Sequence, residues 1–309
     1  MTAYPKYLSF DNRKNVPSVL NQAFPMPDLN TTKRYYPQND RIQPHLHSAD
    51  IERKFEIAQF YKFLKDTIEV EHFLVIPAIA NLNRLNFDIP NKAKEELYKI
   101  ATDEAFHAEQ SLAYLNSLKL QFQIELQNDN APPLFIQKLE QQKRNLKYTS
   151  IAELLPIIFG IITETRISNE LGKFAKNKAL ENSVREICLS HAVDEVIHSS
   201  QFQALGIWLW ESMDEVQKEL VSESFLDALF FRNLPDLASI YQCFSFATGF
   251  SIGESKKAIL NCYSVESIFT EMLEVCKPTV KYLTKHNMVT QQQIEDRIIL
   301  EKKLIQFDS

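Results

Sequence analysis

The five-residue motif D-E-x-x-H occurs twice in this chain, and the two copies constrain the fold more than any other feature of the sequence. They are Asp103-Glu104-Ala105-Phe106-His107 and Asp194-Glu195-Val196-Ile197-His198. Glu and His three positions apart lie on one face of an α-helix, with about 5–6 Å between their Cβ atoms. Each copy therefore places one carboxylate oxygen and one imidazole nitrogen where both can bind a single metal ion.

A single E-x-x-H usually lies on the solvated face of a helix. Two copies preceded by the same Asp should arise by chance in only about a few per cent of chains of this size and composition. The second motif glutamate, Glu195, follows Glu104 by 91 positions, which leaves room for an intervening helix. We therefore expect two helices that each provide half of a two-metal site.

The rest of the sequence favours long helices. The chain has only five glycines in 309 residues, where average usage would give about twenty, and it lacks the Gly-rich turn of Rossmann and P-loop folds. No segment alternates convincingly as a β-strand does. Apolar residues at helical spacing predict helices at about 49–83, 92–118, 150–174, 182–209, 213–231, 236–247, 265–285 and 290–306.

The first 50 residues differ in character from the remainder. They hold six of the thirteen prolines together with polar turn sequences, which predicts an irregular N-terminal arm over residues 1–50. The sequence after residue 50 shows no strong domain boundary. Residues 51–309 are therefore predicted to form one all-α helical domain.

Further carboxylates stand at positions where they could complete the site. Bundles with two iron or manganese ions add one Glu from each of two other helices to the two E-x-x-H pairs. The third helix offers Glu164 beside its apolar stripe, where a buried acid must be paired or metal-bound. The first helix offers Glu71 and Glu69, and periodicity favours Glu71.

Three polar residues extend the two motifs. His191 precedes Glu195 by four positions and His198 by seven, so all three share one helix face. The predicted ligands are then three histidines and four carboxylates. Asp103 and Asp194 each lie four positions before a motif His, a placement that lets the carboxylate accept the outer N–H of a ligating imidazole.

Mixed carboxylate and imidazole ligands suit iron and could suit manganese, whereas zinc does not need seven ligands. The predicted cofactor is therefore a pair of iron ions. Two ferrous ions held together can bind dioxygen and reduce it by two electrons.

The residues just described resemble the p-aminobenzoate N-oxygenase family of di-iron oxygenases. That family carries the pattern E…E-x-x-H…E…H-x-x-x-E-x-x-H on a ferritin-like bundle, and here it is matched by Glu69 or Glu71, Glu104-x-x-His107, Glu164 and His191-x-x-x-Glu195-x-x-His198. The extra histidine separates it from ferritins, acyl-carrier-protein desaturases and hydrocarbon monooxygenases. The likeness covers roughly residues 65–210. The family's spacing fits Glu69 better than Glu71, so both remain candidates.

The resemblance implies a ferritin-like bundle, to which the predicted C-terminal helices are additional, and a di-iron centre with dioxygen as co-substrate. It implies an oxidoreductase that oxygenates the nitrogen of a small-molecule amine, aryl or amino-acid-derived, in a natural-product pathway. An external electron donor is then required. Arg166 and Arg297 are the cations to test as anchors for a substrate carboxylate, although each also has a structural interpretation.

Two other interpretations remain open. The first is a di-iron C–H hydroxylase or desaturase on the same bundle. This interpretation is favoured if the His191 imidazole does not contact metal. The second is a non-catalytic, iron-handling bundle. A purely structural bundle would require both motifs to face solvent. Phe73, Phe106, Phe202, Trp208 and Trp210 are predicted core residues rather than a substrate platform.

Charge and composition limit the other partners. The net charge is −6 and the sequence has no basic stripe, so nucleic acid is not an expected partner. The longest nearly apolar run, 73–80, is too short for a membrane span. The four cysteines are scattered and are predicted to be reduced thiols in a cytoplasmic protein. A homodimer is one possible assembly.

Overall fold

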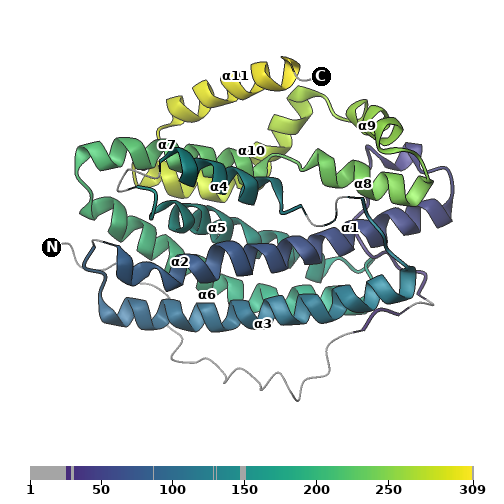
Figure 1. Cartoon of the computed structure of the whole chain (residues 1–309), viewed down its shortest axis with the longest axis horizontal. Helices are drawn as coiled ribbons and strands as arrows, with labels where there is room; N and C mark the ends of the chain where they lie inside the picture. The colour runs from purple at the N-terminus through teal and green to yellow at the C-terminus, as the bar shows by residue number, and fades with distance from the viewer. Residues whose placement is uncertain are drawn as a thin grey trace.

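The computed structural model describes residues 26–28, 31–85, 87–127, 129, 131–146 and 151–307. Within these ranges the chain is helical, without a β-strand, and the predicted all-α bundle is confirmed (Figure 1). An isolated parallel bridge joins Arg34 to Leu180. Of the predicted N-terminal arm, residues 1–25, 29 and 30 lie outside the described residues. The described stretch before Ser48 is irregular apart from a short 3₁₀ turn, Gln43–His45.

Four long helical segments form the inner bundle in the lower part of Figure 1. They are α1 (Ala49–Val70), which continues through a π-helical turn (Glu71–Val75) into α2 (Ile76–Ala80), then α3 (Asn91–Phe122), α5 (Leu155–Lys176) and α6 (Asn182–Ser212). In a closed ring, α1 packs on α3, α3 on α6, α6 on α5, and α5 on the π-helical turn. This ring encloses one interior.

The remaining helices cover one side of this bundle. They are α4 (Leu134–Asn145), α7 (Glu215–Asn233), α8 (Leu237–Thr248), α9 (Ile252–Leu260), α10 (Val265–Lys285) and α11 (Gln291–Phe307). Contacts link α7 and α10 to α5, and α8 to α1 (Figure 1). Helices α4 and α9 were not predicted from the sequence.

Side-chain caps explain where several helices begin. Ser48 accepts a hydrogen bond from the backbone N–H of Ile51 at the start of α1, and Glu181 accepts from two N–H groups at the start of α6. Such caps satisfy N–H groups that have no partner inside the helix. They fix where α1 and α6 begin.

The interior consists of two apolar cores separated by one polar layer. Each of the four long segments contributes to both cores. In α1 the change from one core to the other falls between Leu64 and Val70, and in α5 it falls between Ile162 and Ile167. In α3 and α6 it falls after Ile100 and Cys188 respectively. The residues between these boundaries therefore lie at the same level of the bundle.

Most predicted core aromatics are buried, but Phe73 is not. Phe106, Phe202 and Trp208 are buried and Trp210 is partly buried, whereas Phe73 is 53% exposed. Phe73 lies in the π-helical turn, whose wider winding directs it away from the interior. Its prediction as a core residue is wrong.

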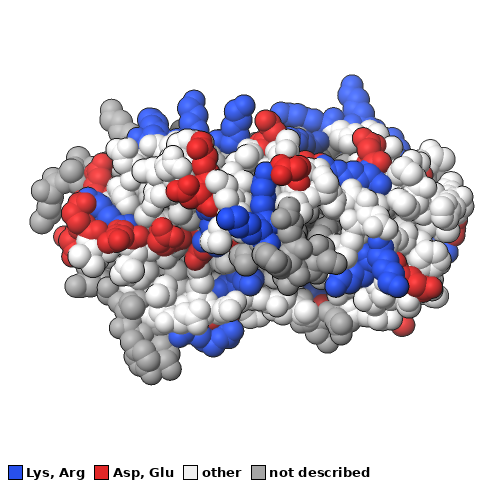
Figure 2. Space-filling view, turned by 90° about the horizontal axis from the view of Figure 1, so that it is seen from above, with Lys and Arg blue, Asp and Glu red and all other residues white. Residues whose placement is uncertain are grey.

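The surface carries charges of both signs, and the cysteines are unpaired with one another. Acidic and basic side chains both occur across the face seen in Figure 2. All four cysteines are free, and Cys188, Cys243 and Cys276 are buried. None of the helices in the described ranges combines the length and the apolar character needed to cross a lipid bilayer.

Candidate metal centre

Seven carboxylate and imidazole side chains occupy the polar layer between the two cores. Each is at most 5% exposed, and together they come from all four segments of the inner bundle: Glu71, Glu104, His107, Glu164, His191, Glu195 and His198. Burial of so many ionisable groups is costly unless charge partners or metal ions compensate for it. The position of the layer follows from the helix registers described above.

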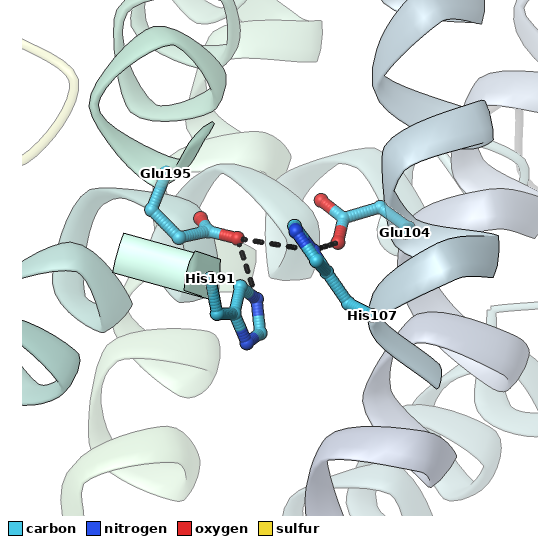
Figure 3. A group of neighbouring side chains, drawn as sticks. All are labelled: Glu104, His107, His191 and Glu195. Atoms are coloured by element: carbon cyan, nitrogen blue, oxygen red, sulfur yellow. Dashed lines mark hydrogen bonds and ion pairs between the residues drawn. The ribbon is translucent and has the colours of Figure 1, made fainter. Parts of the chain in front are cut away.

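One group of four projects from α3 and α6 toward a common point (Figure 3). It consists of Glu104, His107, His191 and Glu195, whose nearest ligand atoms all lie within 4.8 Å of one another. His107 Nδ1 is 2.9 Å from Glu104 Oε2, and His191 Nε2 is 2.8 Å from Glu195 Oε1. Side chains at these separations could bind one metal ion together.

A second group of four adjoins the first. Glu104, Glu164, Glu195 and His198 also place their ligand atoms within 4.8 Å of one another. His198 Nδ1 is 2.8 Å from Glu104 Oε1, 3.3 Å from Glu195 Oε1 and 3.9 Å from Glu164 Oε2. Glu104 and Glu195 belong to both groups, so their carboxylates can bridge two neighbouring ions.

Of the two glutamates predicted on the first helix, Glu71 is the one that lies at the cluster. Glu71 is 1% exposed, its Oε1 is 3.9 Å from His191 Nε2, and its charge interacts with Glu104 and Glu195. Glu69 is only half-buried, and although neither glutamate belongs to the two groups of four, only Glu71 has a described contact with one of their members. The structure thus favours Glu71, as the periodicity does.

The two aspartates pair with imidazoles, but not in the predicted way. The spacing predicts a bond from each Asp to the His four positions later in its own helix. Instead His107 Nε2 lies 3.2 Å from Asp194 Oδ2, and His198 Nε2 lies 3.3 Å from Asp103 Oδ2. Because α3 and α6 run antiparallel, each carboxylate reaches the imidazole of the opposite helix. This leaves the Nδ1 atoms facing the cluster.

The charges in the cluster shift one another's pKa values. Burial, with repulsion from neighbouring carboxylates, raises the pKa of Glu71 and of Glu164 well above the usual range. Burial would also raise the pKa of Glu104, but the charge of His198 and a hydrogen bond with His107 lower it to about 2. Burial would lower the pKa of His107, but hydrogen bonds with Asp194 and Glu104 raise it to about 9. Metal ions must therefore displace protons when they bind.

Several cluster oxygens have no hydrogen bond from any described residue. They include both carboxylate oxygens of Glu71, Oε2 of Glu195 and Oε2 of Glu164. Buried polar atoms are nearly always satisfied. Carboxylate oxygens and imidazole nitrogens gathered in two adjoining groups are the donors that transition metals such as iron accept. The donor set therefore fits a pair of such ions.

The sequence did not reveal the π-helical turn that begins at Glu71. An α-helix that accommodates one extra residue forms such a turn, frequently at a functional site. Here it follows the change between the cores, because Leu64 before it belongs to one core and Leu74 within it belongs to the other. No simple residue pattern signals an extra residue, because the apolar spacing on either side stays helical.

Comparisons with known proteins do not assign this chain to a family. No protein-family model matches the sequence, and no curated protein matches it. The functional conclusion therefore rests on the buried carboxylate and histidine residues and on their geometry.

Proposed function

We propose that this protein binds two iron ions and is a dioxygen-dependent oxidoreductase that oxygenates the nitrogen of an amine. The observation that carries this proposal is the sharing of Glu104 and Glu195 by two adjoining groups of potential ligands. A single-metal site needs no shared carboxylates. Two bridged positions suit a pair of ions that act together on one small molecule.

The ligand atoms support iron over the common alternatives. Structural zinc is typically bound by four ligands, often cysteines, and none of the four cysteines belongs to either group. Magnesium and calcium favour oxygen ligands, whereas this cluster contains three imidazoles. When bound, two ferrous ions would supply the electrons for a two-electron reduction of dioxygen, and an external donor would restore them.

The position of His191 supports nitrogen oxygenation over the other di-iron reactions. A C–H hydroxylase or desaturase would not need a third imidazole at the metals. His191 is 5% exposed and belongs to the same group as Glu104 and His107. This arrangement agrees with the H-x-x-x-E-x-x-H pattern of the p-aminobenzoate N-oxygenases, which the sequence resembles.

The protein itself would hold the metals, exclude water and orient the substrate. The polar layer lies between two apolar cores, so the reacting atoms would be shielded from bulk solvent. Asp103 and Asp194 would keep the imidazoles of His198 and His107 in the tautomer that presents Nδ1 to the cluster.

Iron content and product analysis together test the proposal. The purified chain, loaded anaerobically with ferrous iron, should retain about two irons per chain by elemental analysis. With a reductant, ¹⁸O-labelled dioxygen and a panel of aryl and amino-acid amines, mass spectrometry should detect a product that carries labelled oxygen on nitrogen. Glu104→Ala should abolish both results, whereas Glu109→Gln, an exposed position on the same helix, should leave them unchanged. Retention of less than one iron per chain would contradict the proposal, and labelled oxygen on carbon alone would favour the hydroxylase.

A further inference from the structure

One aspartate connects the candidate metal centre to the surface of the bundle. Asp194 Oδ2 lies 3.2 Å from His107 Nε2, and the other ring nitrogen, His107 Nδ1, faces the cluster beside Glu104. The side chain of Asp194 is 35% exposed, whereas those of Asp103 and of the seven potential ligands are at most 6% exposed. At Asp194, one hydrogen bond and one imidazole ring therefore separate solvent from an atom that could bind metal.

Exposed apolar side chains flank Asp194 on the outer face of α6. Leu189, Val193 and Val196 are 54%, 63% and 56% exposed. They are spaced four and three positions apart, so they share one face of the helix, the α6 apolar face. Val193 is next to Asp194 in the sequence, and Ile197, three positions after Asp194, is only partly buried. Single exposed apolar residues are normal at a surface, but contiguous ones mark a site of interaction.

The surroundings of the α6 apolar face lack positive charge. The sequence has no lysine or arginine at positions 186–217, which include nearly all of α6, and none at positions 100–118 of α3. Glu109 of α3 and Glu186 of α6 are exposed, and Asp194 is partly exposed. A partner that fits this surface therefore has an apolar contact area with basic residues at its edge, because interfaces pair an apolar centre with complementary charges.

The proposed function requires a partner that delivers electrons. Returning two ferric ions to the ferrous state takes two one-electron transfers, and the donor is oxidised by one electron in each of them. Transfer between proteins is faster when the two redox groups are closer, which favours a surface separated from the cluster by only one hydrogen bond and one ring. Complexes between electron carriers are weak and bury little surface, so a short apolar face is sufficient for docking.

We propose that the α6 apolar face beside Asp194 is the docking surface for the electron donor. The donor is a one-electron carrier protein whose redox group lies near an apolar area edged by lysine or arginine. The inference rests on the proposed function, because a protein without redox-active metals needs no such donor. It assigns the exposed Leu189, Val193 and Val196 a role that the metal centre itself does not use.

Binding to the metal-free full chain tests the docking surface apart from any iron chemistry. The probe is ferric cytochrome c, a basic one-electron carrier with lysines around its exposed haem edge. Calorimetric titration at low salt should detect weak binding to the wild type, and added salt should weaken it further. The double variant V193K/V196K places two positive charges in the α6 apolar face. It should bind the probe about tenfold more weakly or less, because like charges oppose docking.

The matched control is V216K/L220K on α7. Val216 and Leu220 are also exposed apolar residues of one helix, at 70% and 43%, and the control adds the same two charges to the chain. A general effect of net charge would therefore alter both double variants equally, whereas V216K/L220K should bind as the wild type does. Circular dichroism shows whether each variant is folded. If V193K/V196K does not fold, Leu189→Lys should show the loss of binding.

Electron transfer from the iron-loaded chain shows whether docking at this face serves the iron. The chain is reduced with dithionite, freed of reductant and mixed anaerobically with ferric cytochrome c, so that each ferrous ion loses one electron and each haem gains one. Haem reduction should be about tenfold or more slower with V193K/V196K than with wild type or V216K/L220K. Oxidation of the iron by a small neutral quinone should proceed at one rate in all three proteins, since a quinone needs no docking surface.

Equal binding by the two double variants, or equal rates of haem reduction, would overturn the inference and leave the proposed function standing. A wild-type dimer in sedimentation analysis that V193K/V196K converts to a monomer would assign the face to a second copy of the chain, and it would overturn the inference too. Failure of the wild type to retain iron would contradict the proposed function itself, and iron analysis reveals it before any protein probe is added.

Discussion

His191 is the side chain on which the proposal of nitrogen oxygenation, in place of the other di-iron reactions, depends. Its ring centroid lies 3.9 Å from that of His107, and its Nε2 is 2.8 Å from Glu195 Oε1. We expect His191→Ala to reduce the bound iron from about two per chain to about one, because one of the two groups loses an imidazole. Amine oxygenation should be lost.

Elemental analysis and the labelled-product assay measure this effect. His72→Ala is the matched control, because His72 is exposed and outside the cluster. Two irons per chain and unchanged product formation in His191→Ala would show that His191 is not a metal ligand and that amine oxygenation does not depend on it.

Asp66 gives the stability of the protein a pH dependence. Burial raises its pKa to about 7, although Lys62 opposes the shift. A carboxyl group with a raised pKa in the folded state binds its proton more tightly there than in the unfolded chain. The stability that the protonated Asp66 carboxyl contributes is therefore complete below about pH 4 and is lost as the pH rises through about 7. Asp66→Asn keeps the neutral form at every pH.

We therefore expect the melting temperature of Asp66→Asn, relative to wild type, to be higher at pH 8 than at pH 5. Thermal unfolding at both values measures it. Asp296→Asn, an exposed position on α11, should show no such difference. An equal change at both pH values would show that the charge of Asp66 costs nothing in the folded protein.

At the level of single residues, the sequence predicted which side chains face inward but not which partner each one meets. Helical spacing placed Glu104, His107, Glu195 and His198 on buried faces. It could not show that Asp103 bonds across to His198, because that contact depends on the antiparallel register of two helices 87–95 positions apart. Periodicity describes one helix at a time.

Among the elements, the π-helical turn is the one most directly connected to the site. It begins at Glu71 and contains the exposed Phe73. Deleting Phe73 should convert the turn to a regular α-helix while α1 and α2 keep their contacts, since such a turn accommodates one extra residue. The melting temperature should stay within a few degrees of wild type. Iron affinity should fall about tenfold or more, because Glu71 is displaced.

A deletion of Lys65 in the regular part of α1 is the control. It should rotate the following turns by about 100° and prevent folding, because no extra residue is available to lose. Circular dichroism measures whether each variant folds, and titration with ferrous iron measures its iron affinity. If the Phe73 deletion retains normal affinity, the turn does not position a ligand.

The long helices and the 12-residue α8 were predictable, whereas α4 and α9 were not. The predicted helix at 265–285 coincides with α10, Val265–Lys285, because its apolar spacing is regular over many turns. Helix α9 has nine residues and includes Gly253, so its periodic signal is weak. Its Ser251–Glu254 capping box was the available signal. Helix α4 follows two prolines, which resemble a loop.

For the whole molecule, the polar layer concentrates repelling charges between two apolar cores. Iron binding should therefore stabilise the fold. Ligand binding to the native state at a concentration of about a hundred times its Kd contributes about 2.7 kcal/mol, which corresponds to a rise of several degrees in melting temperature. Anaerobic thermal unfolding with and without ferrous iron measures the rise.

Magnesium at the same concentration is the control, because it avoids imidazole ligands, and it should leave the melting temperature unchanged. A chelator should reverse the iron effect. An identical response to both metals would show that neither occupies the polar layer. The all-α bundle itself is confirmed, whereas its ferritin-like topology stays a prediction, because helical periodicity does not determine how helices connect in space.

The reciprocal bonds between the two motifs affect how this site could be transferred to another scaffold. Asp103 serves His198, and Asp194 serves His107. Either helix grafted alone would therefore carry an imidazole without the aspartate that bonds to it, and an aspartate without its imidazole. The transferable unit is the antiparallel pair, and any host must accept both helices in their original register.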